Sequence, residues 1–211
     1  MRPPRIPPMV TDVILTAVCS FDGVEFDQIT RCPHCSGPLM GYDLRDKKFA
    51  TLKESDHERS ITVRVKRFTC KTCGKLINAD EPFYPDSRIG SIIIDLYRTL
   101  SETMPSNRAA RIIDAMGIVV DRTTWRNYSS RVMPDIPTVD IFGMKLPISI
   151  LTISTIAARL PEGGRIEGAE ALAACGFPSA YRAAPDLLPA GKERNKRKKQ
   201  EEKEEREPGA P

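Results

Sequence analysis

The sequence predicts an α+β protein, in which a small β module is followed by three helices. Two Cys-x-x-Cys pairs, Cys32/Cys35 and Cys70/Cys73, bracket a segment where apolar and polar residues alternate, as they do in a half-buried strand. Beyond residue 86, apolar residues recur every three or four positions, which is the period of a helix with one buried face. After residue 191 the chain consists mainly of Lys, Arg and Glu, and this composition predicts a disordered tail.

We therefore expect five segments. Residues 1–29 form a leader with a short strand, 30–81 the β module, 82–133 the helical module, 134–190 a poorly defined segment rich in small residues, and 191–211 the charged tail. In the first segment, residues 1–12 are rich in proline, and 13–21 read as a short strand that ends in a turn at Asp22 and Gly23.

The composition favours a protein without a membrane span. Of the 211 residues 18 are proline and 6% are aromatic, which indicates small modules and linkers rather than a densely packed enzyme. Lys145, Pro147 and Arg159 interrupt the most apolar stretch, 141–160. The apolar run at 13–18 lacks the small residue of a signal-peptide cleavage site. We expect a protein of the reducing cytoplasm.

The four paired cysteines predict a Zn²⁺ site. Each Cys-x-x-Cys turn directs two thiolates to the same metal, and structural zinc takes four such ligands in a tetrahedron. Two disulfides would require an oxidising compartment, and a redox pair needs only one such motif at the start of a helix. Zinc is the better interpretation, with Cys32, Cys35, Cys70 and Cys73 as ligands. Cys19 and Cys175 have no partner at ligand spacing, and we expect them to be interior residues.

The strand between the two pairs is marked by Ile61, Val63 and Val65, and its partner is expected at 39–44 or 48–52. The polar loop 53–60 contains His57. Because four cysteines complete the site, we expect His34 and His57 to be surface residues.

Positive charge is concentrated around this strand. Between residues 59 and 75 there is no acid, and there are six basic residues: Arg59, Arg64, Lys66, Arg67, Lys71 and Lys75. Such a local excess suits a polyanion such as nucleic acid, although a solvated hairpin face is the alternative.

Three helices follow the β module. The first is capped by Asp86 or Ser87, buries a face from 89 to 100 and ends near 104–105. The second spans 107–116, with Ser106 as its N-cap and Gly117 in the left-handed position after it. The third spans 122–132, is capped by Asp121 and is closed by Pro134.

This order is typical of a helix-turn-helix whose third helix reads DNA. Its inward residues are Thr124, Trp125, Tyr128 and Val132, and its outward residues are Arg122, Thr123, Arg126, Asn127 and Arg131. Arginine and asparagine side chains bind base edges or phosphates, although outward basic residues can also be merely solvated. The expected DNA contacts are these outward residues together with Arg64, Lys66, Arg67, Lys71 and Arg108. Further on, 147–160 fits a strand or a helix, and 168–175 fits a short helix that ends before Gly176.

The region from about 30 to 133 resembles the N-terminal part of transposases of prokaryotic insertion elements. The likeness rests on three segments, which read RCPHC at 31–35, FTCKTCG at 68–74 and SNRAARIIDAMGIVVDRTTWRNY at 106–128. The resemblance implies a zinc ribbon and a homeodomain-like helix-turn-helix that bind the ends of a mobile element.

Such transposases also carry a ribonuclease-H-like domain whose acidic residues hold two Mg²⁺ ions. Only 78 residues follow Met133, and their acids have no alternating strand pattern to bring them together. We therefore expect no catalytic residues and a zinc-dependent, nucleoid-associated protein that binds double-stranded DNA as a truncated or repurposed form of such a transposase. A homodimer, or a transposase supplied in trans, is left open as a further partner. The alternative is a zinc-ribbon adaptor for protein interactions or a transcription regulator.

Overall fold

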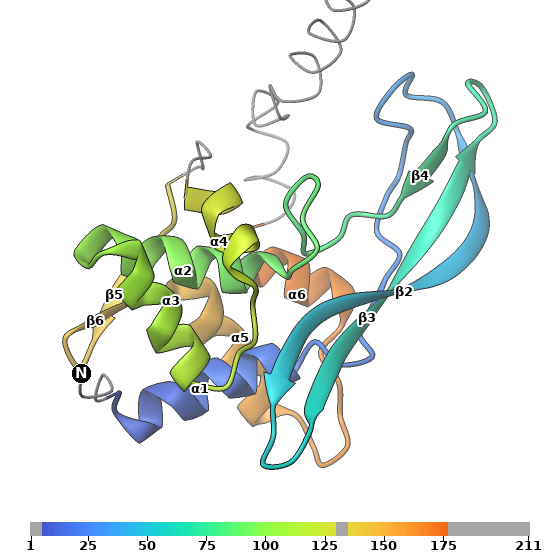
Figure 1. Ribbon diagram of the computed structural model, residues 1–211. Coiled ribbons are helices and arrows are strands. Elements are labelled where there is room, and N and C mark those ends of the chain that lie inside the picture. Colours follow the sequence, from blue (N-terminus) through green and yellow to red (C-terminus); the bar gives the residue numbers. More distant parts are fainter. Residues whose placement is uncertain (1–5, 130–134, 177–211) are drawn as a thin grey trace, which may run out of the picture.

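The computed structural model describes residues 6–129 and 135–176, and the predicted α+β class is confirmed in them. Figure 1 shows a body of helices beside a long, twisted hairpin whose far end projects away from the body. The expected charged tail lies outside the described residues. None of the described helices combines the length and the apolar character needed to cross a bilayer.

The hairpin consists of β2 (Leu39–Lys53) and β3 (Glu58–Cys70), which pair in antiparallel fashion along their whole length. On the other side of β3, β1 (Glu25–Phe26) pairs in parallel and β4 (Leu76–Asn78) pairs in antiparallel orientation. The predicted alternation on β3 is confirmed, because Ile61, Val63 and Val65 are buried. Both segments proposed as its partner, 39–44 and 48–52, belong to the single strand β2, and the connecting turn is shorter than the predicted loop.

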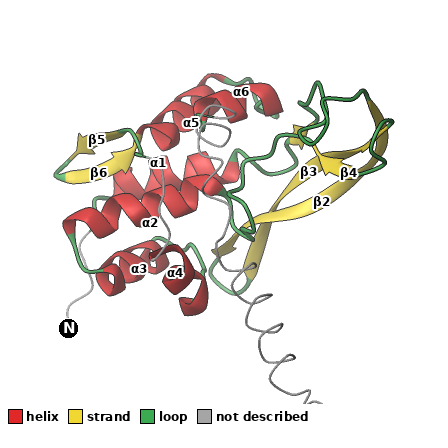
Figure 2. Ribbon diagram, turned by 90° about the horizontal axis from the view of Figure 1, so that it is seen from above, coloured by secondary structure: helices red, strands yellow, loops and turns green. Residues whose placement is uncertain are grey.

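The helical body contains α1 (Pro8–Cys19), α2 (Ser91–Thr103), α3 (Ser106–Ala115), α4 (Arg122–Ser129), α5 (Ile148–Arg159) and α6 (Gly168–Ala174). A small hairpin of β5 (Thr138–Ile141) and β6 (Met144–Pro147) packs against α2. Figure 2 shows α5 and α6 on one side of α2 and α3 and α4 on the other. The segment 147–160, for which a strand or a helix was expected, is a helix apart from its two end residues. The predicted helix at 168–175 is confirmed, and Gly176 follows it with a φ of 77°.

The prediction of a strand at 13–21 was wrong, because this segment lies mainly in α1. Val10, Ile14, Ala17 and Val18 are buried at helical spacing, and α1 packs against α5. Pro8 is compatible with the helix because the first turn needs no hydrogen bond from its nitrogen. The β-branched residues suggested a strand by propensity, and tertiary packing overrides that preference.

The three helices predicted between 87 and 132 are present, and the first two start at other residues than predicted, whereas the third starts at Arg122 as predicted. The first begins at Ser91 after Gly90, and neither Asp86 nor Ser87 caps it. The second begins at Ser106 itself, so Ser106 is inside the helix and Pro105 precedes it. Gly117 adopts a φ of 87° in the turn between α3 and α4, as predicted. The third helix is described as far as Ser129, and its predicted end at 130–134 lies outside the described residues.

One hydrophobic cluster joins the helices to the near half of the long hairpin. It includes Ile14 of α1, Leu96 of α2 and Ile153 of α5 together with Phe49 of β2 and Ile61 of β3. A second, much smaller cluster at the far end contains Cys32, Cys70 and Ile77. The expected boundary between the β module and the helical module, at residues 81 and 82, therefore does not separate two cores, because the large cluster contains residues from both modules.

Backbone hydrogen bonds fasten the outer edge of β2 to the helical body. The N–H of Gly90 donates to the carbonyl of Phe49 at 2.8 Å, and the N–H of Val119 donates to Thr51 at 2.8 Å. Gly90 has to be a glycine, because a Cβ there would lie 2.2 Å from the Phe49 ring. These contacts fix the start of α2 and the turn before α4 against the hairpin.

Candidate metal centre and nucleic-acid interface

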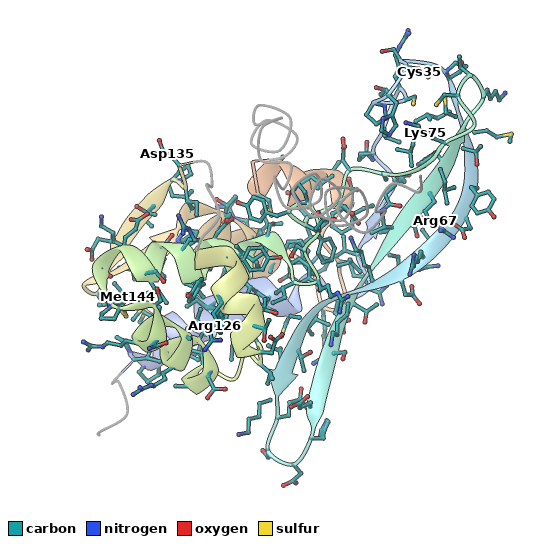
Figure 3. The ribbon with its side chains drawn as sticks, turned by 45° about the horizontal axis from the view of Figure 1, so that its top comes forward. Cys35, Arg67, Lys75, Arg126, Asp135 and Met144 are labelled. Atoms are coloured by element: carbon teal, nitrogen blue, oxygen red, sulfur yellow. The ribbon has the colours of Figure 1, made fainter. Side chains whose placement is uncertain are left out.

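The four paired cysteines meet at the far end of the hairpin, where Figure 3 labels Cys35. Their four sulfur atoms all lie within 4.8 Å of one another. The Sγ atoms of Cys32 and Cys73 are 3.7 Å apart, and those of Cys35 and Cys70 are 3.4 Å apart. A tetrahedron with zinc–sulfur bonds of about 2.3 Å has edges of about 3.8 Å, so these separations fit a metal site with four cysteine ligands. They exceed a disulfide bond of about 2.05 Å by far, and all four thiols are free.

The two turns that carry the cysteines have the same internal hydrogen bonds. The N–H of His34 donates to the Cys32 sulfur at 3.4 Å, and the N–H of Thr72 donates to the Cys70 sulfur at 3.4 Å. The carbonyls of Cys32 and Cys70 accept from Ser36 and Gly74 at 2.8 and 2.9 Å. Such amides stabilise negative charge on sulfur, so each turn is preorganised to present thiolates.

The electrostatics of the cluster favour a cation at its centre. Backbone N–H groups of Cys73 and Thr72 lower the pKa of Cys70 to about 6, although desolvation opposes this shift. At Cys35 the backbone of Gly37 also lowers the pKa, but the sulfur of Cys70, burial and the other sulfurs raise it to about 12. Four thiols this close cannot all ionise beside one another, whereas a bound divalent cation offsets the repulsion.

The far end of the hairpin has little apolar material of its own. Cys32, Cys70 and Ile77 are buried there with Ile29 and Leu39 packed against them, while Cys35 and Cys73 are exposed. His34 and His57 are exposed, as predicted. Cys19 and Cys175 are half-buried against the main cluster, and neither belongs to the group of four converging sulfurs.

Half of the basic residues between 59 and 75 are paired with acids that come from other segments. Arg59 contacts Asp22 at 2.9 Å, Arg64 contacts Glu25 at 3.4 Å, and Arg67 binds Asp43 through both oxygens. Arg64 also approaches Asp46 at 3.9 Å. The ion pair raises the pKa of Arg67 and lowers the pKa of Asp43. Two of the expected DNA contacts, Arg64 and Arg67, therefore already have anionic partners.

The other expected contacts on this module are differently placed. Lys66 is half-buried, with its Nζ 5.6 Å from the centre of the Phe68 ring. Lys71 and Lys75 are exposed beside the second cysteine pair, where Figure 3 labels Lys75. No ion pair joins these three lysines to an acid within the described residues. Within the basic group at 59–75, the exposed and unpaired cations are therefore Lys71 and Lys75 at the cysteine end of the hairpin.

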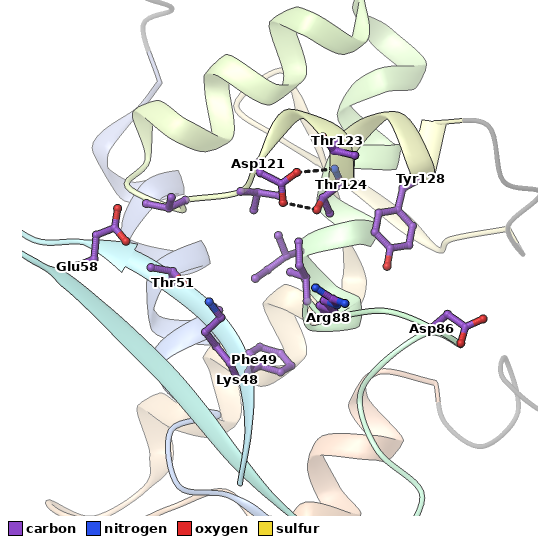
Figure 4. Close-up of a pocket in the computed structure, with 15 residues that line it drawn as sticks. Lys48, Phe49, Thr51, Glu58, Asp86, Arg88, Asp121, Thr123, Thr124 and Tyr128 are labelled. Atoms are coloured by element: carbon purple, nitrogen blue, oxygen red, sulfur yellow. Dashed lines mark hydrogen bonds between the residues drawn. The ribbon is translucent and has the colours of Figure 1, made fainter.

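Asp121 starts α4 as predicted. Its Oδ1 accepts from the N–H of Thr124 at 2.9 Å, and its Oδ2 accepts from the Thr124 hydroxyl at 2.5 Å. Both bonds lower the pKa of Asp121, and the carboxylate satisfies amides that the first turn leaves without a helical partner. Figure 4 shows this cap beside a hollow that lies between α4 and β2.

The faces of α4 agree with the predicted division where they are described. Trp125 is buried and stacks on Tyr97 of α2 at 4.3 Å between ring centres, and Tyr128 is also buried. Thr124 is half-buried, whereas Thr123 and Arg126 are exposed. Arg108 of α3 is exposed as well. The side chains of Arg122 and Asn127, and all of Arg131 and Val132, lie outside the described part of the chain.

Sequence reasoning missed a second group of cations. Arg45 and Lys48 of β2 and Arg88 of the loop before α2 are exposed along the edge of the hairpin. In the sequence Arg45 and Lys48 lie among acids, and Arg88 is 40 positions from Lys48, so no linear charge run indicated the group. Searches against protein-family models, curated proteins and solved structures found no match to this chain.

Proposed function

We propose that the protein is a zinc-dependent, non-enzymatic protein that binds double-stranded DNA. The observation that carries the proposal is the cysteine cluster, whose four sulfurs lie within 4.8 Å of one another on a projecting hairpin that also bears exposed lysines. Cys32, Cys35, Cys70 and Cys73 would hold the Zn²⁺, which supplies structural stability rather than chemistry.

Support for zinc comes from the four sulfur ligands and from the small number of buried apolar side chains around them. Four thiolates in a tetrahedral arrangement suit Zn²⁺, because this ion prefers soft sulfur ligands and accepts four-coordination. The far end of the hairpin buries too few apolar side chains to be stable alone, and a metal offsets that deficit. Both amide-to-sulfur bonds hold the ligands in place before the metal binds.

Support for DNA comes from α3, the turn at Gly117 and α4. This unit has the order of a helix-turn-helix, with Trp125 and Tyr128 anchoring α4 and with Thr123 and Arg126 exposed on it. In Figure 3, Arg126 lies on α4 within the helical body. Threonine and arginine contact base edges or phosphates, and a short helix held at its inner face can present them to the major groove.

The resemblance to the end-binding region of insertion-element transposases suggests the target. We infer a protein that recognises a specific duplex sequence, such as the end of a mobile element, without cutting it. A catalytic partner would then be supplied in trans.

The direct test is an electrophoretic mobility shift with zinc-loaded protein and a duplex, at 50 and 200 mM salt. The complex should weaken steeply at the higher salt, because each neutralised phosphate releases counterions. Absence of any shift at 50 mM with a pool of random duplexes would refute the proposal. If the protein does bind, selection of bound duplexes from that pool reveals the preferred sequence.

A protein-interaction adaptor is the second candidate, and one observation favours it. Met40 of β2 and Leu76 of β4 both pair with Thr69, so they lie on one face of the sheet, and they are 54% and 47% exposed. Tyr42 nearby is 63% exposed. Exposed apolar residues that gather in one place often mark a binding surface. Capture of a protein that survives nuclease treatment and is lost in Met40→Ser/Leu76→Ser would support this candidate, and retention by the variant would refute it.

A further inference from the structure

Two hollows lie along the outer edge of β2, one near the middle of the hairpin and one between the hairpin and α4. One, of about 360 Å³, is lined by residues of β2, β3, β4 and the loop before α2. The other, of about 650 Å³, is lined by β2, by that same loop and by the start of α4. Lys48 and Arg88 line both hollows, so they mark the place where the two adjoin.

The smaller hollow is strongly basic. Its lining includes five cations, Arg45, Lys47, Lys48, Arg67 and Arg88, against one acid, Asp46. Two of the cations are compensated, because Lys47 contacts Glu81 at 2.8 Å and Arg67 binds Asp43. Lys48 and Arg88 are exposed, and neither forms an ion pair with another described residue. Uncompensated neighbouring cations repel one another, and an anion bound between them removes that repulsion.

The larger hollow is lined by both acidic and basic side chains, and it extends toward α4. Glu58, Asp86 and Asp121 line it together with Lys48 and Arg88, and Asp121 is engaged in the cap of α4. Thr123 lines it from the α4 side. In Figure 4, Lys48 and Arg88 lie across this hollow from Asp121 and Thr124. The available cations therefore lie on the rim that joins the two hollows, next to the proposed DNA-reading helix.

We propose that Lys48 and Arg88, with Arg45, bind the phosphodiester backbone of the duplex whose bases α4 contacts. This inference rests on the proposed function and names contacts that the acid-free stretch at 59–75 does not contain. An extended polyanion fits the arrangement, because the cations follow a strand edge and the hollows continue one another instead of closing around a small ion. Lysine and arginine contacts to phosphate fix the position of a protein on DNA without reading sequence.

The position of this rim gives it a structural role in recognition. The start of α2 and the turn before α4 are both hydrogen-bonded to β2 near Lys48, at Phe49 and Thr51. Because the phosphate contacts and the reading helix are held by the same backbone, binding of phosphate at the rim fixes the register of α4 on the duplex. Loss of the rim cations should therefore lower affinity on all sequences alike.

The test compares the wild-type protein with Lys48→Ala/Arg88→Ala by fluorescence anisotropy, on the selected duplex and on a random one, over a salt series. The slope of log affinity against log salt should fall in magnitude by about 1 to 2, since each lost phosphate contact removes about 0.9. Affinity at 0.1 M salt should fall roughly 10- to 100-fold on both duplexes, because a slope change of about 1 to 2 acts over one decade of salt concentration below 1 M.

The matched control is Lys145→Ala/Arg159→Ala, which removes the same charge from β6 and α5, where both side chains are exposed. Its salt slope should stay close to that of the wild type. If the wild type binds duplex and the two variants behave alike, the rim is not a phosphate site and the proposal is overturned while the proposed function stands. If the wild type binds no duplex at low salt, the proposed function itself fails.

Discussion

The two ends of the β2–β3 hairpin are stabilised by different means. At the near end, Phe49 stacks on Phe21 at 4.1 Å between ring centres and belongs to the large cluster shared with the helices. At the far end, Cys32, Cys70 and Ile77 are the buried members of a small cluster beside four converging thiols. Apolar burial holds the first end, and by our proposal a metal holds the second. One strand pair can therefore be firm at one end and conditional on zinc at the other.

Removal of the metal should give the largest difference between the two ends. Chelation, or Cys70→Ser, should reduce bound zinc from one ion per chain to none and unfold the far end, because structural zinc contributes about 10 kcal/mol or more to folding of such modules. Hydrogen exchange should lose protection at 39–43 and 67–70, while α1 and α2 keep theirs. Loss of protection throughout the chain would show that the two ends are not independent.

Shortening a buried side chain at the near end should destabilise the whole molecule instead. Phe49→Ala removes a fully buried ring that also packs edge-on against Phe83, and we expect a loss of about 3–5 kcal/mol. Urea unfolding with saturating zinc measures the loss. The control is Tyr42→Ala on the same strand, where the side chain is 63% exposed and the change should be less than about 1 kcal/mol. Equal losses of unfolding free energy in the two variants would contradict the idea that apolar burial stabilises only the near end of the hairpin.

The helical end should carry a pH dependence of its own, which comes from a buried carboxyl group and not from the thiolates of the metal end. Asp95 of α2 is buried and accepts the Tyr84 hydroxyl at 2.5 Å, and desolvation raises its pKa to about 7. The folded state therefore holds a proton that the unfolded state releases near pH 4, so stability is lost as pH rises from about 4 to about 7. The loss is ~1.4 kcal/mol per pH unit within that window.

Urea midpoints at pH 5 and pH 7.5 check this sign, with Asp95→Asn as the comparison. The variant should show a smaller fall in stability between the two pH values. An equal fall in both proteins would mean that Asp95 ionises in the folded state as it does in the unfolded one.

Loss of the α4 cap should have the smallest effect. Asp121→Ala removes both bonds to Thr124, and we expect about 1 kcal/mol of destabilisation confined to the start of α4. Asp121→Asn keeps an oxygen acceptor and should recover most of the loss. Thermal unfolding distinguishes the three proteins, and identical melting temperatures would indicate that the cap contributes nothing.

Local patterns predicted much of the fold. The alternation at 61–65 and the helical spacing at 89–100 correspond to observed elements, because each pattern reports which face of one segment is buried. Gly117 was predictable because a left-handed residue after a helix is usually glycine. The segment 13–21 failed, since its β-branched residues favoured a strand although 10, 14, 17 and 18 are spaced for a helix. The long reach of β2 was also missed, because the charged residues 45–47 separate the two apolar fragments and a register shift interrupts the alternation inside each fragment.

The candidate site was predictable only where it is local. Cys-x-x-Cys spacing identified the four thiols, and Asp121 was recognised as a cap, because both depend on neighbours in sequence. The partners of Arg64 and Arg67 come from β1 and β2, so half of the cations in a stretch without acids are paired with acids in the fold. Lys48 and Arg88 meet only through the docking of the loop before α2 on β2.

The most direct test of a zinc-dependent DNA-binding protein is the affinity for duplex DNA of the zinc-loaded protein, after chelation and after zinc is restored. Our account predicts that affinity falls at least tenfold on chelation and returns with zinc, since the lysines at the far end of the hairpin depend on the metal for their position. An unchanged affinity in the chelated protein, with zinc loss verified by elemental analysis, would contradict it.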